Sequence, residues 1–287
     1  MLVDLVQATT ADGVRLDGML QMPTGKSVLP VAAVCLVHGT GGNFYSSSLF
    51  DALGERFLAL GCAVLRVNTR GHDGISNAVT ARGGRRLGAA YEVVDDCRYD
   101  LAAWTDWLHA RVGPRVGLVG HSLGAVKCLY ALAQTAPPPA HCVIAVSPPR
   151  LSYSWFCSTA KAEEFLQTFG SAQQHVERGQ PDMLLDVKFP LPFAITAAGY
   201  VEKYGPDERY NYLRLLPSVK CPTLITLGSL EVRENAAFQG APEALQERAA
   251  KQQDLHTAVI DGADHFYSEA RPQLVAALQA WLRSAPN

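Results

Sequence analysis

The sequence lacks long hydrophobic runs and an excess of charge of either sign. Its 287 residues hold 25 basic and 27 acidic side chains, which leaves a formal net charge of −2. A chain with so balanced a charge is a poor match for nucleic acid or an acidic membrane surface. No apolar run approaches the roughly 20 residues of a membrane span, and the first residues show no basic region or apolar stretch typical of a secretory signal. We therefore expect a cytoplasmic protein with no nucleic-acid and no membrane partner.

Cysteine pairs at metal-binding or redox spacing are also missing. The seven cysteines include no C-x-x-C pair, so neither a zinc site nor a redox motif is indicated. Four of them, Cys35, Cys62, Cys128 and Cys142, lie within apolar runs. We expect these four to be small buried hydrophobic residues with reduced thiols.

What the sequence does contain is an alternation of apolar strand-like runs and amphipathic helical segments. Strands are expected at 31–37, 62–67, 116–119, 142–146, 222–228 and 257–260, preceded by an edge hairpin formed by 2–8 and 14–22. Helices are expected from about 46–48 to 60, and at 95–111, 125–132, 241–253 and 271–283. This alternation predicts an α/β fold with a mostly parallel, doubly wound sheet.

One interruption of this alternation is the polar stretch 75–91, which is rich in Gly and Arg. It reads as a long loop, and loops of that length in a compact domain are often functional. Arg82, Arg85 and Arg86 could meet a substrate carboxylate if the loop folds over a pocket. The simpler alternative is a solvated basic loop.

A second interruption covers residues 150–218, which are rich in aromatic side chains. The segment has helical spacing in places and no convincing strand, so we interpret it as a helical lid. On this interpretation 1–149 and 219–287 form the core domain and 150–218 is an insertion. The aromatic residues then favour a substrate with an apolar or aromatic group, although most of them must pack the segment onto the core.

The stretch Gly120-His121-Ser122-Leu123-Gly124 follows one of the predicted strands and precedes a helix. This G-x-S-x-G pattern between strand and helix is typical of a nucleophile elbow, a sharp turn that lifts a serine above the sheet. We expect side chains at Gly120 or Gly124 to clash with neighbouring elements. The Leu123 N–H then lies at a helix start, where it can stabilise developing negative charge.

A serine nucleophile needs a base within hydrogen-bond reach. His265 follows the last predicted strand and precedes the last helix, which suits that base. His121 lies inside the elbow and should point away from the Ser122 hydroxyl. His38 and His72 fall in loops at the same edge of the sheet, where we expect them to shape the site.

A third group must hold the base in the correct tautomer. The loop after the strand that ends at Gly228 contains Glu231, which we expect to be this acid, and Glu234, which is its main competitor. Asp264 is next to His265 and is more consistent with shaping the loop. A solvated surface position is the alternative for both glutamates.

The oxyanion formed during acyl transfer needs unobstructed backbone N–H donors. Leu123 is expected to supply one, and Thr40 the second, with Gly41 as the next candidate. The glycine-rich loop that carries Thr40 follows a buried strand, at the edge where ligands bind in open α/β sheets. We expect His38, Gly39 and Gly41 to contact the substrate. The loop lacks the lysine and glycine spacing of a phosphate cradle.

These motifs together resemble an α/β-hydrolase of the serine-esterase type. The matching residues, in the family's order, are His38-Gly39-Thr40-Gly41-Gly42, Arg70-Gly71-His72, the elbow, Gly228 with Glu231, and Gly262-Ala263-Asp264-His265. The resemblance implies a mostly parallel sheet of about eight strands flanked by helices, a Ser–His–acid triad and no cofactor. Glu231 stands where many members have Asp.

The sequence therefore predicts a hydrolase of carboxylic esters, lactones or thioesters that acts on a small molecule through an acyl-enzyme on Ser122. The same triad could cleave amides or the carbon–carbon bond of a β-diketone-like substrate. A different class, a hydrolase-like fold that only binds a ligand, is disfavoured because all three triad members are present. Whether the protein is a homodimer is left open.

Overall fold

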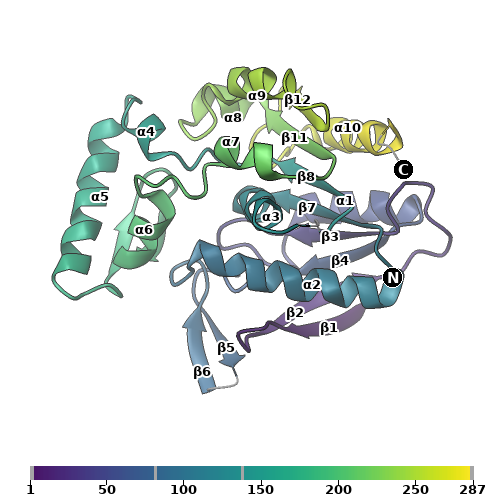
Figure 1. The fold of residues 1–287 in the computed structure, drawn as a ribbon, viewed down its shortest axis with the longest axis horizontal. Coiled ribbons are helices and arrows are strands. Elements are labelled where there is room, and N and C mark those ends of the chain that lie inside the picture. Colours follow the sequence, from purple (N-terminus) through teal and green to yellow (C-terminus); the bar gives the residue numbers. More distant parts are fainter. Residues whose placement is uncertain (1–2, 81–82, 137–138, 285–287) are drawn as a thin grey trace.

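The computed structural model describes residues 3–80, 83–136 and 139–284 and is built around one eight-stranded sheet (Figure 1). In sheet order the strands are β1 (Asp4–Thr9), β2 (Arg15–Gln21), β4 (Ala63–Val67), β3 (Ala33–Val37), β7 (Val116–His121), β8 (Cys142–Val146), β11 (Thr223–Gly228) and β12 (Leu255–Ile260). The pairs β1–β2 and β2–β4 are antiparallel and the remaining neighbours are parallel. This confirms the mostly parallel sheet of about eight strands that the sequence predicts.

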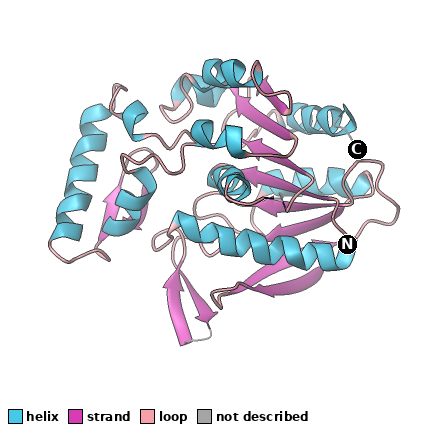
Figure 2. Cartoon of the chain, in the orientation of Figure 1, coloured by secondary structure: helices cyan, strands magenta, loops and turns pink. Residues whose placement is uncertain are grey.

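Helices cover both faces of the sheet (Figure 2). On one face α1 (Ser48–Ala59) and α10 (Arg271–Ser284) share a hydrophobic cluster. On the other, a larger cluster joins α2 (Cys97–Val112), α3 (Leu123–Ala133) and α9 (Ala241–Ala249). Every residue of β3, β4, β7, β8 and β11 is buried, as expected for strands covered on both faces.

The cysteines follow the prediction made from their apolar surroundings. Cys35, Cys62, Cys128 and Cys142 are buried, and all seven cysteines are free thiols. Cys157, at the C-terminal end of the short helix α4 (Tyr153–Phe156), is the one that is only partly buried. Among the residues that the structure describes, no helix is both long and apolar enough to span a bilayer.

The prediction of a structureless loop at 75–91 is wrong. Strands β5 (Ser76–Thr80) and β6 (Gly83–Leu87) form an antiparallel hairpin that projects from the edge of the molecule. Its strands are short and polar, so they lack the hydrophobic signal by which strands are predicted. Arg86 packs over the ring of Tyr91 within the same segment, and neither Arg85 nor Arg86 lines the pocket described below. Arg82 lies outside the described residues.

Residues 150–218 lie beside the sheet rather than within it and contain more than helices. The segment comprises α4, α5 (Ala162–Glu177), β9 (Leu184–Val187), β10 (Phe193–Thr196), α6 (Ala197–Tyr204), α7 (Tyr212–Leu215) and the 3₁₀ turn η2 (Leu216–Ser218). The prediction that it holds no strand is wrong, because β9 and β10 pair as a small antiparallel sheet. These strands are too short to display a period in the sequence.

A further short helix, α8 (Ser229–Glu234), follows β11, and α9 ends at Ala249 rather than at the predicted 253.

Most aromatic side chains of this segment are used for packing. Phe189 packs edge to face against both Phe156 and Phe165, and these two rings are tilted against each other. Tyr200 and Tyr210 are fully buried. Such ring pairs stabilise a core by about 0.5–1.5 kcal/mol each beyond the area that they bury. The same buried cluster includes residues of α2, α3 and the sheet, so the simpler interpretation of the aromatic content, packing of the segment onto the core, accounts for most of it.

One carboxylate, that of Glu208, joins the two ends of the segment. Its Oε1 accepts hydrogen bonds from the Ser154 N–H (2.7 Å) and the Ser152 hydroxyl (2.9 Å). Its Oε2 accepts one from the Asn211 amide (2.8 Å). Burial alone raises the pKa of Glu208, but hydrogen bonds from Ser154 and Asn211 outweigh it and lower the pKa to about 2.

We expect Glu208→Gln to lower the free energy of unfolding by about 2 kcal/mol at pH 7, since bonds to an ionised acceptor are lost. The folded-state pKa lies below the ordinary value of 4.5, so this stabilisation is present above that pH and disappears as the pH falls towards about 2. Urea denaturation of both proteins from pH 7 to pH 2.5 measures the difference. Glu247→Gln, on the exposed face of α9, is the matched control and should change stability by less than about 0.5 kcal/mol. A gap between Glu208→Gln and wild type that does not narrow at low pH contradicts the assignment.

Candidate active site

Ser122 occupies a strained turn between β7 and α3. Its backbone angles are φ 57° and ψ −126°, a region that residues with a side chain rarely adopt. The turn is possible because its glycines pass very close to other backbones. A Cβ at Gly120 would lie 2.4 Å from the Gly124 carbonyl oxygen, and one at Gly124 would lie 2.2 Å from that of Val37. The expected clash at both glycines is thus confirmed.

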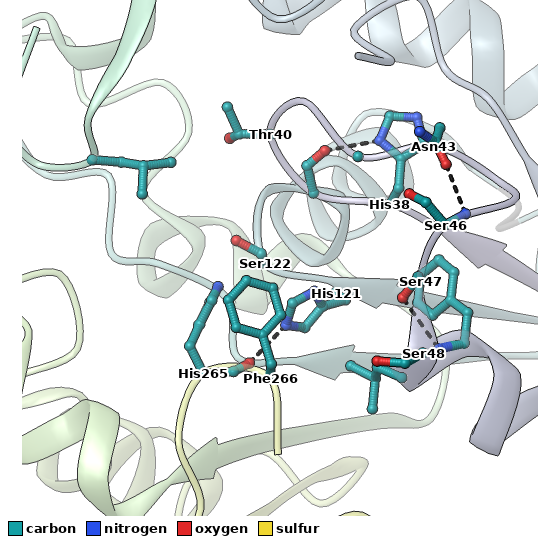
Figure 3. A pocket seen from close by; sticks show the side chains of 15 residues that line it. His38, Thr40, Asn43, Ser46, Ser47, Ser48, His121, Ser122, His265 and Phe266 are labelled. Atoms are coloured by element: carbon teal, nitrogen blue, oxygen red, sulfur yellow. Dashed lines mark hydrogen bonds between the residues drawn. The ribbon is translucent and has the colours of Figure 1, made fainter. Parts of the chain in front are cut away.

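His265 and Glu231 meet beside this turn. His265 Nδ1 lies 2.7 Å from Glu231 Oε2, and the His265 side chain points towards Ser122 (Figure 3). Glu231 lies in the first turn of α8, where its Oε1 accepts the N–H of Gly228 at 2.7 Å. The Glu231 side chain is 2% exposed. A buried acceptor on Nδ1 leaves Nε2 of a neutral His265 as the free, unprotonated nitrogen.

The competing acids lie elsewhere. Glu234 is an exposed residue that pairs with Arg233 at 2.7 Å. Asp264 accepts the N–H groups of Phe266 (3.1 Å) and Ser268 (2.8 Å), and in this way it shapes the loop that carries His265. Of the candidates weighed from the sequence, Glu231 is the carboxylate that contacts His265.

Two residues that the sequence analysis missed lie behind Glu231. The Ser147 hydroxyl donates to Glu231 Oε1, and its oxygen lies 2.9 Å from the Tyr267 hydroxyl, which also meets Thr226 Oγ1 at 3.2 Å. Ser147 and Tyr267 are fully buried, and burial together with the neighbouring Glu231 raises the pKa of Tyr267. Ser147 could have been predicted from its position, because it directly follows a predicted strand at the same edge of the sheet as the other site residues.

The glycine-rich loop after β3 passes directly over the serine. A Cβ at Gly39 would lie 2.8 Å from Ser122 Cβ, so only glycine allows this approach. Gly39 and Thr40 line the pocket beside Ser122, whereas Gly41 is not among the residues that line it. Gly41 instead has a φ of 63°, which turns the loop. Leu123 is the first residue of α3, where a backbone N–H has no partner within the helix.

His38 lines the pocket but is committed to the fold. Its Nδ1 meets the Gly39 carbonyl oxygen at 2.8 Å, and its Nε2 accepts the N–H of Thr69 at 3.0 Å. Burial, reinforced by the charge of Lys127, lowers the pKa of His38 to about 3. His38 is therefore neutral, and both of its ring nitrogens are bonded to the backbone of neighbouring loops. Its contact with substrate stays a prediction.

His121 also has a fixed partner. Its Nε2 donates to the backbone carbonyl of His265 at 2.8 Å, so it ties the elbow to the loop that carries the base. Burial and the charge of His265 lower the pKa of His121 to about 3. His72 pairs with the Asp73 carboxylate at 2.9 Å. Neither ring contacts the Glu231 carboxylate.

A pocket of about 360 Å³ opens at the carboxyl ends of the central strands. Its walls come from the elbow, the loop after β3, the loop that carries His265, and α1. The lining residues are His38, Gly39, Thr40, Gly42, Asn43, Ser46, Ser47, Ser48, Leu49, Phe50, His121, Ser122, Leu191, His265 and Phe266. Leu191 is the one contribution of residues 150–218 to this set. Among the described residues that line the pocket, the histidines are the ones with an ionisable side chain. Within the described ranges no cluster of His, Cys, Asp and Glu is arranged to hold a metal ion.

The chain was compared with known proteins. A model of the alpha/beta hydrolase family matches residues 36–278. A search of curated proteins found no match. Solved structures with the same fold include an esterase of Pyrococcus furiosus, which is 17% identical with a TM-score of 0.63 over 100% of this chain and 92% of that one.

Two further structures resemble the chain over nearly its whole length. Est1E from Butyrivibrio proteoclasticus, solved with ferulic acid bound, is 15% identical with a TM-score of 0.65 over 98% of this chain and 99% of Est1E. The alpha/beta hydrolase GrgF from a Penicillium species is 15% identical with a TM-score of 0.69 over 99% of each chain. At these identities the similarity is one of fold.

We expect Gly124→Ala to destabilise the protein by about 3 kcal/mol or more, because its Cβ would overlap the Val37 carbonyl oxygen. Gly170→Ala in α5 is the matched control: its added Cβ meets nothing within 4 Å, so it should be neutral or stabilise the helix by up to about 1 kcal/mol. Thermal and urea unfolding measure both effects. Equal stability of the two variants would show that the close passage at the elbow is not a constraint.

Proposed function

Because the chain belongs to the alpha/beta hydrolase family, we propose that it is a serine hydrolase that cleaves carboxylic esters, with lactones and thioesters as related substrates. The observation that carries this proposal is the 2.7 Å contact between His265 Nδ1 and Glu231 Oε2 beside a serine on a strained turn. A strand–turn–helix serine, a histidine with a free Nε2 and a buried carboxylate are the three parts that acyl transfer requires.

In the proposed reaction His265 Nε2 takes the proton of the Ser122 hydroxyl as the oxygen attacks the ester carbonyl. The imidazolium that forms is stabilised by the Glu231 carboxylate, which remains ionised. His265 then gives its proton to the leaving alcohol, and an acyl-enzyme remains on Ser122. Water, activated by the same histidine, attacks the acyl carbonyl and releases the acid.

The oxyanion of each tetrahedral intermediate is bound by the backbone N–H groups of Leu123 and Thr40. The first belongs to the free N-terminal turn of α3, whose dipole favours negative charge. The second belongs to the loop that crosses over Ser122 at Gly39. Removal of one oxyanion-hole donor from a serine hydrolase lowers kcat by about 10²–10³.

The pocket favours a small, uncharged substrate with an apolar or aromatic group. Its volume of about 360 Å³ is at the lower end of the range of roughly 300–1,000 Å³ typical of ligand pockets. Phe50, Phe266 and Leu191 give it apolar walls. Apart from the Asn43 amide and three histidines, the polar side chains that line it are hydroxyls. The ferulic acid bound to Est1E is an aromatic acid, the type of acyl group that such walls would accommodate.

We assign residues 150–218 a role as a lid over the core formed by 1–149 and 219–287. The support is Leu191, which this segment contributes to the pocket wall, and the Glu208 bonds that join its two ends. A lid of this type sets which substrates enter and excludes water during the reaction.

Ser122→Ala should abolish hydrolysis of p-nitrophenyl acetate and butyrate while the protein stays folded, since the nucleophile alone is removed. A fluorophosphonate should add once to the wild type, at Ser122, and not to the variant, which intact-mass spectrometry detects. Amide, lactone and β-diketone substrates are assayed beside the esters. Undiminished ester hydrolysis by Ser122→Ala would disprove the proposal. If the wild type turns over an amide or a β-diketone faster than the esters, the proposed reaction is amide or carbon–carbon bond cleavage instead of ester hydrolysis.

Glu231→Gln should lower kcat by about 10²–10⁴, because an amide cannot stabilise the imidazolium and can hold the wrong tautomer. Glu234→Gln removes the same charge from an exposed pair and should leave kcat unchanged. Steady-state kinetics with p-nitrophenyl butyrate compare the two. The reverse result would make Glu234 the acid.

A further inference from the structure

A line of buried polar contacts runs from α3 to the loop over Ser122. The Lys127 ammonium donates to Thr69 Oγ1 at 3.0 Å, and Thr69 Oγ1 lies 3.2 Å from His38 Nε2. His38 Nδ1 in turn meets the Gly39 carbonyl oxygen at 2.8 Å. Lys127 and Thr69 are fully buried and His38 is 2% exposed. The contacts therefore connect a charged residue of the elbow helix with the loop that carries a proposed oxyanion donor.

The chemistry of Lys127 gives this line one direction. An ammonium can only donate hydrogen bonds, so Thr69 Oγ1 accepts from Lys127 and turns its own proton to His38 Nε2. The backbone N–H of Thr69 donates to the same nitrogen at 3.0 Å. His38 Nε2 is therefore the unprotonated nitrogen, and Nδ1 carries the hydrogen that is donated to the Gly39 carbonyl.

This last bond orients a peptide group. The Gly39 carbonyl oxygen is held from two sides, by His38 Nδ1–H and by the Gly42 N–H at 3.1 Å. In a trans peptide the C=O and the following N–H point in opposite directions. A Gly39 carbonyl anchored on His38 thus directs the Thr40 N–H away from His38, and Thr40 lines the pocket beside Ser122.

Glu92 compensates the charge of Lys127. Its Oε1 lies 2.5 Å from Lys127 Nζ, and both side chains are buried. The carboxylate fits because residue 71 is glycine: a Cβ at Gly71 would lie 2.0 Å from Glu92 Oε1. Burial raises the pKa of Glu92, but the charges of Lys127 and of Lys203 on α6 outweigh it and lower the pKa. Replacement of a buried ion pair by apolar residues of similar volume is often neutral or stabilising, so this pair is weak evidence for a purely stabilising role.

We propose that Lys127 and Thr69 are positioning residues of the oxyanion hole, which act through His38 to fix the Gly39–Thr40 peptide. The inference rests on the proposed function, because it gives the Thr40 N–H its role. Neither residue touches the substrate. They hold a donor in place before the reaction begins, so their contribution is made in the transition state rather than in substrate binding.

The test compares three variants. Thr69→Val keeps the side-chain shape and removes the hydroxyl that links Lys127 to His38, whereas Thr69→Ser keeps the hydroxyl. Thr105→Val is the matched control: Thr105 is equally buried, and its hydroxyl bonds only the Leu101 and Ala102 carbonyls within α2. The readouts are kcat and KM for p-nitrophenyl butyrate and the inhibition constant of a trifluoromethyl ketone, which forms a tetrahedral adduct on the serine.

Thr69→Val should lower kcat about tenfold and leave KM within twofold of wild type. It should also raise the inhibition constant of the trifluoromethyl ketone about tenfold. Thr69→Ser should restore both values to within about threefold, and Thr105→Val should change neither. An active wild type whose Thr69→Val variant retains kcat overturns the inference and leaves the proposed function intact. Equal losses in Thr69→Val and Thr105→Val also overturn it, since they indicate general loosening. A wild type without ester hydrolysis overturns both.

If Thr69→Val does not fold, the double variant Lys127→Met with Glu92→Gln breaks the line at its other end. It removes both partners of the ion pair together, and Lys203 keeps Glu202 as a neighbouring carboxylate. The same pattern, a loss in kcat and in ketone affinity with KM preserved, is expected for it. A double variant with wild-type kcat overturns the inference.

Discussion

The arrangement at the carboxyl edge of the sheet depends on how closely three backbones pass one another. Gly39, Gly120 and Gly124 lie where an added Cβ would come within 2.8 Å of a neighbouring atom or closer. Because these backbones touch, β7 can turn abruptly at Ser122 into α3, and the loop after β3 can cross directly above the serine. A bulkier residue at any of the three would separate parts that must lie within a few ångströms for the acyl transfer that we propose.

Around this contact the polar groups are oriented by two buried networks, one on each side of Ser122. On one side Ser147 and Tyr267 lie behind Glu231 and hold the carboxylate against His265. On the other, Lys127 and Thr69 lie behind His38. In both, a side chain that lies next to a proposed catalytic group is held by buried residues farther from Ser122, which is how proteins keep donors and acceptors oriented without solvent reorganisation.

The sequence predicted the parts that carry their own local signal. Buried parallel strands appear as continuous apolar runs, so the sheet could be predicted without coordinates. The geometry of the turn requires glycine two residues before and two residues after Ser122, so the elbow could be predicted as well. The networks could not, because their members, such as Ser147 and Glu231 or Lys127 and Thr69, are far apart in the sequence, and a contact between distant residues leaves no local pattern. The choice between Glu231 and Glu234 stayed open because the turn of α8 that buries one and exposes the other was not predicted. The hairpins β5–β6 and β9–β10 are too short or too polar to show a period.

The distribution of thiols has a practical consequence for watching this molecule move. Six of the seven cysteines are enclosed by the sheet and its helices, while Cys157 is partly accessible and belongs to the aromatic segment beside the core. Accessible thiolates react first with maleimides and similar reagents. The unaltered sequence thus offers one preferred attachment point for a fluorophore or spin label, on the segment whose opening and closing would be of most interest.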